Sequence, residues 1–278
     1  MTFFVHGATG AQGSPVLAAL HASGQAAAAA VRTPSSYTGP GTAVAVDLDS
    51  PASLVDAYRG AEGVFVHLPI GPPAQQIAHA LIIADAVEEA RPARVVLSTS
   101  GYTLDDPESA VAVLARRLTD SGVSSVVVQP RLYLENLLLP VVVGPVHAAG
   151  VLGYPLRDDY AVSWSSHLDV ADVVVRLLQD PAVTGVVEVG ALPGLVGTDL
   201  AQGFAEHLGR EVRFESMEPD EFERLITPLF GPGAAPVADS YRWRATQPHE
   251  LVGEENSAQR RLGMTPRTVV QWLRGTGI

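Results

Sequence analysis

The sequence contains neither cysteine nor lysine in its 278 residues. Without cysteine the chain forms no disulfide, no thiolate metal site and no cysteine nucleophile. All 18 basic residues are therefore arginine, and every mechanism that requires a lysine ammonium is excluded. Codon bias alone would explain the missing lysine, but the chemical exclusion holds whatever the cause.

Charge is also scarce. Charged residues make up 17% of the chain and hydrophobic residues 47%, a balance typical of a well-packed globular protein. The net charge is -12 and no basic stripe is visible, so nucleic acid is not expected as a partner.

The N-terminus lacks the features of a signal peptide, and charges and prolines interrupt the apolar stretch 126–144 too often for a membrane span. We therefore expect a cytoplasmic protein.

Short apolar runs alternate with helical patterns through about residue 130, which predicts an α/β fold with a Rossmann-type, doubly wound parallel sheet. Strands are expected at 2–6, 26–32, 42–46, 63–68, 94–98 and 124–129, and helices at 13–23, 51–59, 74–91 and 108–121. Beyond this point the alternation is lost, and the segment 230–239, rich in glycine and proline, is expected to be a loop. We predict a nucleotide-binding domain over 1–150 and a smaller, partly interleaved C-terminal α/β substrate lobe over 151–278.

Gly7, Gly10 and Gly13 follow the first expected strand and precede the first expected helix. Glycines allow a tight turn and close backbone approach, and a helix N-terminus attracts phosphate, so this context favours dinucleotide binding. The spacing is G-x-x-G-x-x-G, and an ordinary turn is the alternative.

The residue after the second strand distinguishes between the two nicotinamide dinucleotides. An NAD site usually has an acidic residue there, whereas this chain has Arg32 and no acid before Asp47. A guanidinium suits the 2′-phosphate of NADP(H), with a solvated arginine as the alternative. Asp47, after the third strand, is placed to bind the adenine amine, and a role in capping a helix or in a turn is an equal alternative.

Ligands in open parallel sheets lie beyond the carboxyl ends of the strands. The residues that follow the fourth and fifth strands are accordingly expected near the nicotinamide, although plain loop structure is an equal alternative for each. They are His67, Leu68, Pro69, Ser98, Thr99, Ser100 and Tyr102.

Several segments together resemble one known family. These segments are GATGAQG, VRTP, VDLDSPASLVDAYRGAEGVF, LTDSGVSSVVVQPRLYLENLL and HLDVADVVVRLL. They occur in the order seen in NmrA-like proteins, which are atypical short-chain dehydrogenase/reductases. That group includes NADPH-dependent quinone and triphenylmethane-dye reductases. The resemblance implies that Arg32 meets the 2′-phosphate and that Tyr133 and Asn136 lie near the substrate cleft. It also implies that the pyrophosphate is lined by Gly7, Thr9, Gly10, Gln12 and Gly13.

The chain departs from the wider superfamily because it cannot contain a Tyr-x-x-x-Lys pair, and Val111 stands where relatives often carry Lys or His. Proton delivery would then come from water or from a weak phenol, with Tyr102 and Tyr133 as the candidates. Packing or a hydrogen bond at the rim of the site is the alternative for each tyrosine. Tyr160, Trp164 and His167 are expected either to line an apolar pocket for a planar substrate or to pack in the smaller lobe.

The prediction is an NADPH-dependent oxidoreductase that transfers hydride to a small conjugated or aromatic electrophile such as a quinone, enone or iminium. One alternative is a non-catalytic NADP(H)-sensing regulator that acts through a protein partner. Another is a non-redox isomerase or cyclase on the same scaffold. The sequence has no G-x-S-x-G elbow, no H-E-x-x-H and no metal-ligand spacing among its eight histidines, so no metal site is expected.

Overall fold

The computed structural model describes residues 2–277, which form two compact units. Unit 1 comprises the chain as far as Pro130 together with His167–Val189, and unit 2 comprises Arg131–Ser166 together with the chain from Gly190 onward. The division predicted from sequence differs because its boundary at residue 150 falls inside unit 2. The physical reason is that the chain leaves the main sheet after residue 130 and later returns to it for one more helix and strand.

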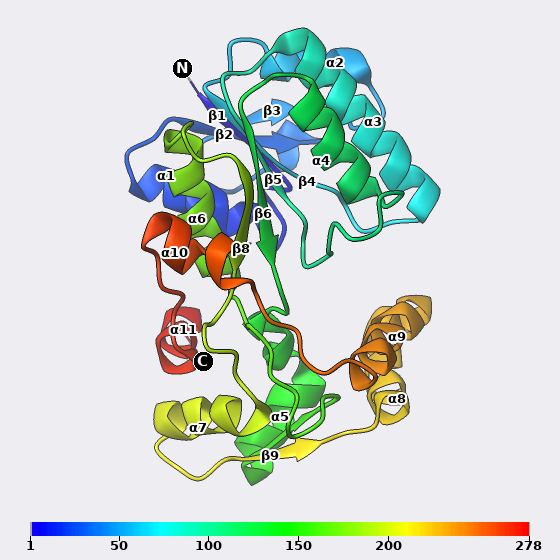
Figure 1. Ribbon diagram of the computed structural model, residues 1–278, viewed down its shortest axis with the longest axis vertical. Coiled ribbons are helices and arrows are strands. Elements are labelled where there is room, and N and C mark those ends of the chain that lie inside the picture. Colours follow the sequence, from blue (N-terminus) through cyan, green and yellow to red (C-terminus); the bar gives the residue numbers. More distant parts are fainter. Residues whose placement is uncertain (1, 278) are drawn as a thin grey trace. The chain divides into compact units, whose positions relative to one another are not determined.

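Unit 1 is built on a parallel sheet of seven strands in the order β3-β2-β1-β4-β5-β6-β8 (Figure 1). The strands are β1 Phe3–His6, β2 Ala27–Val31, β3 Thr42–Ala45, β4 Gly63–His67, β5 Val95–Ser98, β6 Ser125–Pro130 and β8 Gly185–Val189. The strand order reverses between β1 and β4, which is the switch point where doubly wound folds bind ligands. The predicted Rossmann-type fold is confirmed.

Helices cover both faces of this sheet. They are α1 Gly13–Ala22, α2 Pro51–Tyr58, α3 Pro73–Ala90, α4 Ala110–Asp120 and α6 His167–Gln179, with a short 3-10 turn η1 at Pro34–Ser36. α1 packs against α6 on one face, and α2, α3 and α4 pack in a row on the other (Figure 1). The predicted strands and helices before residue 130 are all present, with ends that differ by one or two residues. Serine side chains cap α2 and α4: Ser50 Oγ accepts a hydrogen bond from the Ser53 amide, and Ser109 Oγ accepts one from the Ala112 amide.

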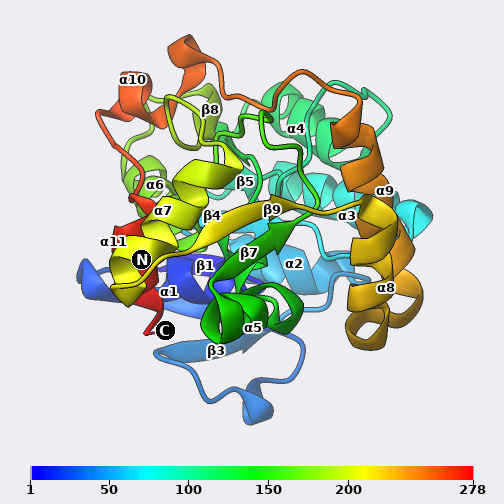
Figure 2. The ribbon, with the colours of Figure 1, turned by 90° about the horizontal axis from the view of Figure 1, so that it is seen from below.

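Unit 2 contains a two-stranded parallel sheet of β7 Val151–Tyr154 and β9 Arg213–Ser216, with α5 and α7 beside it (Figure 2). Its helices are α5 Pro140–Ala149, α7 Gly197–Leu208, α8 Pro219–Phe230, α9 Ala234–Ala245, α10 Ala258–Leu262 and α11 Val269–Thr276. Short 3-10 turns are η2 Leu134–Leu138, η3 Gly231–Gly233 and η4 Glu254–Asn256. The core of unit 2 includes the buried aromatic residues Tyr154, Trp164, Phe204, Phe222, Tyr241 and Trp272.

The predicted loop at 230–239 is wrong, because η3 and the first half of α9 occupy it.

None of the helices within residues 2–277 combines the length and the apolar character needed to cross a membrane.

Candidate functional site

The glycine turn after β1 is closed on itself by backbone contacts. Gly7 has a φ of +59°, and its carbonyl accepts a hydrogen bond of 2.7 Å from the Gly10 amide. A Cβ added at Gly13 would lie 2.3 Å from the Gly7 oxygen, so no side chain fits there. The turn thus brings the N-terminus of α1, the positive end of its helix dipole, to the carboxyl edge of the sheet beside the switch point. This arrangement fits the phosphates of a dinucleotide.

Gln12 joins this turn to the end of β5. Its side-chain nitrogen donates to Ser100 Oγ at 2.9 Å, and its oxygen accepts from Ser98 Oγ at 2.8 Å. Ser100 is one of two non-glycine residues within 2–277 with a positive φ, at 57°. The Gln12 side chain is buried and engaged in this bridge, which orders the β5 loop. Its role at the pyrophosphate remains a prediction, as do those of the exposed Thr9 and of the turn glycines.

Arg32 follows β2 directly and is exposed. Among the described residues its guanidinium makes no hydrogen bond or ion pair, so its charge is available to a ligand. Asp47 lies after β3, where its Oδ1 accepts from the Asp49 amide at 3.0 Å and its own amide donates to Ser53 Oγ. This is a turn-stabilising arrangement, and it leaves a role at the adenine as a prediction.

Two histidines of unit 1 lie within electrostatic reach of His67 at the end of β4: His6 at the end of β1 and His167 at the start of α6. Burial and, to a smaller extent, the nearby His67 lower the pKa of His6 to about 3 and that of His167 to about 4. Burial also lowers the pKa of His67, against an opposing backbone hydrogen bond with Leu68. The three imidazoles are therefore neutral at neutral pH.

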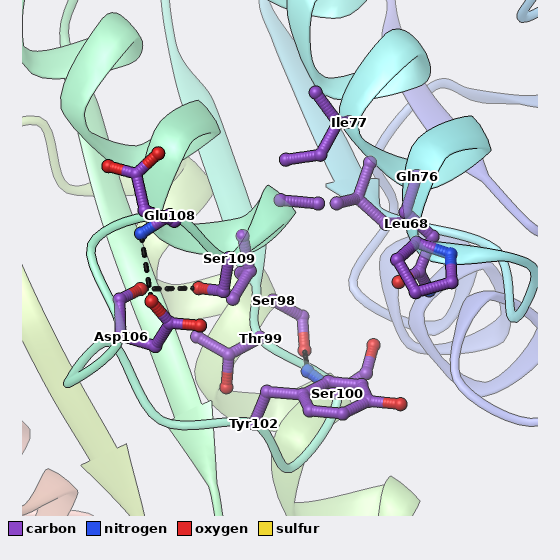
Figure 3. Close-up of a pocket in the computed structure, with 13 residues that line it drawn as sticks. Leu68, Gln76, Ile77, Ser98, Thr99, Ser100, Tyr102, Asp106, Glu108 and Ser109 are labelled. Carbon is purple, nitrogen blue, oxygen red and sulfur yellow. Dashed lines mark hydrogen bonds between the residues drawn. The ribbon is translucent and has the colours of Figure 1, made fainter.

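A cavity of about 260 Å³ opens where β4 and β5 end, beside the first turns of α3 and α4 (Figure 3). Its walls are Leu68, Pro73, Gln76, Ile77, Ser98, Thr99, Ser100, Tyr102, Asp106, Glu108, Ser109, Ala110 and Val111. The structure thus brings together five of the residues predicted to lie near the nicotinamide. Pro69 is not among the walls, and its carbonyl accepts from Gln76 Nε2 at 2.9 Å.

The polar side chains of this cavity carry hydroxyls, carboxylates and the amide of Gln76. Thr99 Oγ1 is buried and has no hydrogen-bond partner within residues 2–277, while Tyr102 is 58% exposed. Asp106 Oδ1 accepts from the Glu108 amide at 3.0 Å, and Ser109 Oγ donates to the Asp106 carbonyl. No wall residue is basic. Sequence reasoning missed Gln76, Ile77, Asp106 and Glu108, since no local pattern shows that the loop before α4 faces the end of β4.

The other predicted substrate residues belong mainly to unit 2. Tyr133 precedes η2 and forms a β-bridge with Ser165, while the Asn136 side chain hydrogen-bonds to Tyr154. Tyr160 and Trp164 are each 1% exposed and pack in the core of unit 2, although Tyr160 also borders a small pocket with Arg157 and Arg244. His167 instead starts α6 of unit 1. Their substrate roles remain predictions.

The described residues contain no group of three or more His, Cys, Asp or Glu side chains placed to hold a metal ion.

A sequence model of the NmrA-like family matches residues 1–258. The chain belongs to the NmrA-like family.

Individual relatives of this NmrA-like protein are distant in sequence. An NAD(P)H azoreductase from Xenophilus azovorans is 27% identical over 233 residues, which are 82% of this chain and 80% of the relative. The structure of an NADPH-dependent quinone oxidoreductase from Escherichia coli, complexed with NADPH, is 18% identical, covers all of both chains and has a TM-score of 0.76. That of a Citrobacter sp. triphenylmethane reductase complexed with NADP(H) is 16% identical, covers 99% of both and has a TM-score of 0.78. These structural likenesses show the shared fold.

Proposed function

We propose that this protein is an NADPH-dependent reductase of small conjugated electrophiles. The glycine turn supports cofactor binding, because Gly7 and Gly13 let the backbone close where a Cβ would collide with backbone or His67, and the closed turn brings the N-terminus of α1 to the edge of the sheet. When bound, a reduced nicotinamide supplies the hydride. The azoreductase, quinone oxidoreductase and triphenylmethane reductase among the relatives support acceptors of the quinone, azo or dye class.

The observation that carries the choice of NADPH over NADH is Arg32. It stands at the end of β2, next to β1, where an NAD site usually has an acidic residue. Its guanidinium is exposed and unpaired among the described residues, so a 2′-phosphate would not have to displace another partner. A bidentate, charge-assisted contact of this kind accounts for a strong preference.

The cavity beside β4 and β5 fits the acceptor side of the reaction. Leu68, Ile77 and Val111 supply apolar walls for a planar group, and the Thr99 hydroxyl is available to one of its polar atoms. Tyr102 is the phenol that lines this cavity and is one of the two proposed proton donors. Because the chain has no lysine to acidify that phenol, the best acceptors are those that disperse the incoming charge over a conjugated system.

The activity test follows the absorbance of NADPH in the presence of a panel of quinones, azo dyes, cationic dyes and enones. Turnover with any of them supports the reductase. Tight NADPH binding without turnover across the panel would contradict it and would favour the NADP(H)-sensing alternative.

The cofactor preference is tested by Arg32→Ala. We expect the Kd for NADPH to rise by about 10- to 100-fold, because a charge-assisted hydrogen bond contributes about 1.5–3 kcal/mol, and the Kd for NADH to change little. Arg224→Ala is the matched control, since Arg224 on α8 is also exposed and unpaired within residues 2–277. Equal losses for NADPH and NADH in Arg32→Ala would overturn the assignment of the 2′-phosphate.

A further inference from the structure

The imidazole of His67 lies directly against the glycine turn. A Cβ built on Gly7 would be 2.1 Å from His67 Nε2 and 2.8 Å from its Cε1, so Nε2 occupies the space beside the Gly7 backbone. His67 Nε2 is buried and has no hydrogen-bond partner among the described residues. An unsatisfied buried polar atom is costly, and here it belongs to the side chain nearest to Gly7.

The segment that forms the turn supplies no fixed positive charge. Residues 5–16 contain no arginine, and their only titratable side chain is His6, which is buried and hydrogen-bonded through Nε2 to the Tyr58 hydroxyl at 2.8 Å. A dinucleotide diphosphate carries two negative charges, which the α1 N-terminus balances only in part. An imidazolium at His67 would provide a full charge together with a donor at Nε2.

We propose that His67 takes up a proton from solvent when the cofactor binds and that the resulting imidazolium is a ligand of the diphosphate. The inference rests on the proposed use of a nicotinamide dinucleotide. It adds that binding and protonation are linked, so the enzyme binds its cofactor more tightly as the pH falls.

The surroundings of His67 leave it as the group that changes charge. From β1 it faces His6 and from α6 it faces His167, and both have pKa values near or below about 4, so they stay neutral above that pH. From β5 its register partner is the uncharged Ser98, and the turn that contacts it contributes the backbone of Gly7. Burial lowers the pKa of His67 in the free protein, and an adjacent anion raises it.

Calorimetry of NADH binding in two buffers of different ionisation enthalpy tests the inference on the unmodified protein. NADH is the probe because it lacks a 2′-phosphate that would titrate in the same range. We expect uptake of up to one proton per NADH and a Kd that rises with pH by up to about tenfold per pH unit between about pH 5 and 8. No proton uptake, with measurable binding, would overturn the inference.

His67→Gln retains a polar side chain but cannot be protonated. We expect it to bind NADH with no proton uptake and a flat pH profile, whereas His249→Gln, at an exposed site in unit 2, should behave as the wild type does. Unchanged proton uptake in His67→Gln would also overturn the inference; if that variant does not fold, the wild-type calorimetry decides. Turnover with an acceptor but without proton uptake on binding contradicts this inference alone, whereas absence of any dinucleotide binding contradicts the proposed function as well.

Discussion

At the scale of single residues, Gly13 is the position at which a substitution tests the glycine turn most directly. Its Cβ would approach the carbonyl oxygens of Gly7 and His6 to 2.3 and 2.5 Å, so Gly13→Ala forces the backbone apart. We expect a loss of about 1–3 kcal/mol in the free energy of unfolding, as for other overpacked sites. We also expect at least a roughly tenfold rise in the Kd for NADPH, which equals about 1.4 kcal/mol. Denaturant unfolding and fluorescence titration measure the two effects.

Gly144→Ala is the control for this change. Gly144 lies inside α5, where an added Cβ meets no heavy atom within 4 Å, so alanine should be neutral or stabilise the protein by about 0.4–1 kcal/mol. NADPH binding that survives Gly13→Ala unchanged would show that the turn does not hold the cofactor.

The same residues show what the sequence could and could not predict about the site. Glycine spacing between a strand and a helix was enough to predict the turn, because the pattern is local. The hydrogen bonds of Gln12 with Ser98 and Ser100 join residues more than 80 positions apart, so no local pattern in the sequence predicts them. The contact of His67 with Gly7 is hidden for the same reason: it depends on the register of β1 against β4.

At the scale of elements, prediction worked where strand and helix alternate and failed where glycine and proline suggested a loop. In α9 the prolines lie before the helix and in its first turn, where Pro236 forfeits an amide that has no partner inside the helix. The helix then continues through Ala238 and Tyr241, which pack inward. Tertiary burial of this face, which cannot be read from a short window, outweighed the local turn signal.

Arg94 yields a prediction about how elements of unit 1 are joined. It precedes β5 and is 2% exposed, and it donates to Ser124 Oγ and to the carbonyls of Leu177, Asp180 and Val183. These bonds connect β5 to the start of β6 and to the C-terminal end of α6. Arg94→Met should lower the free energy of unfolding by about 2–4 kcal/mol, because unmade buried hydrogen bonds cost about 1–3 kcal/mol each.

The Kd for NADPH should not change in Arg94→Met, since Arg94 lies at the amino ends of the strands and the glycine turn at their carboxyl ends. Arg59→Met is the matched control. Arg59 is exposed, and its guanidinium lies 4.0 Å from the Glu89 carboxylate. Exposed ion pairs of this kind contribute little to the free energy of unfolding. A stability loss in Arg59→Met as large as that in Arg94→Met would contradict the role assigned to the buried network.

At the scale of the whole molecule, the alternation of strands and helices predicted the class of fold but not how the chain is shared between its two units. The segment that returns to unit 1, residues 167–189, has the same helix-then-strand pattern as the segments before residue 130. Its membership is decided by the pairing of β8 with β6, a contact between strands separated by more than 50 residues. A boundary placed by composition cannot detect such a return.

Acid sensitivity of the molecule follows from two histidines of unit 1, the buried His6 and the partly buried His167. The pKa values of His6 and His167 are lowered to about 3 and 4 in the folded state, from 6.5 in the unfolded chain. Between these values the unfolded state binds more protons, so stability is fully present above about pH 6.5 and is lost as the pH falls toward 4. The free energy of unfolding should drop by up to about 1.4 kcal/mol per pH unit for each histidine.

Two spectroscopic probes assign this loss to a unit. The three tryptophans, at 164, 243 and 272, all lie in unit 2, whereas His6 and His167 belong to unit 1. We expect the denaturation midpoint from far-UV circular dichroism to fall between pH 7 and 5 at least as steeply as the midpoint from tryptophan fluorescence. A steeper fall in fluorescence would place the acid-sensitive groups in unit 2. His6→Asn should reduce the slope, since one of the imidazoles whose pKa is lowered by burial is gone, while His249→Gln should leave it unchanged.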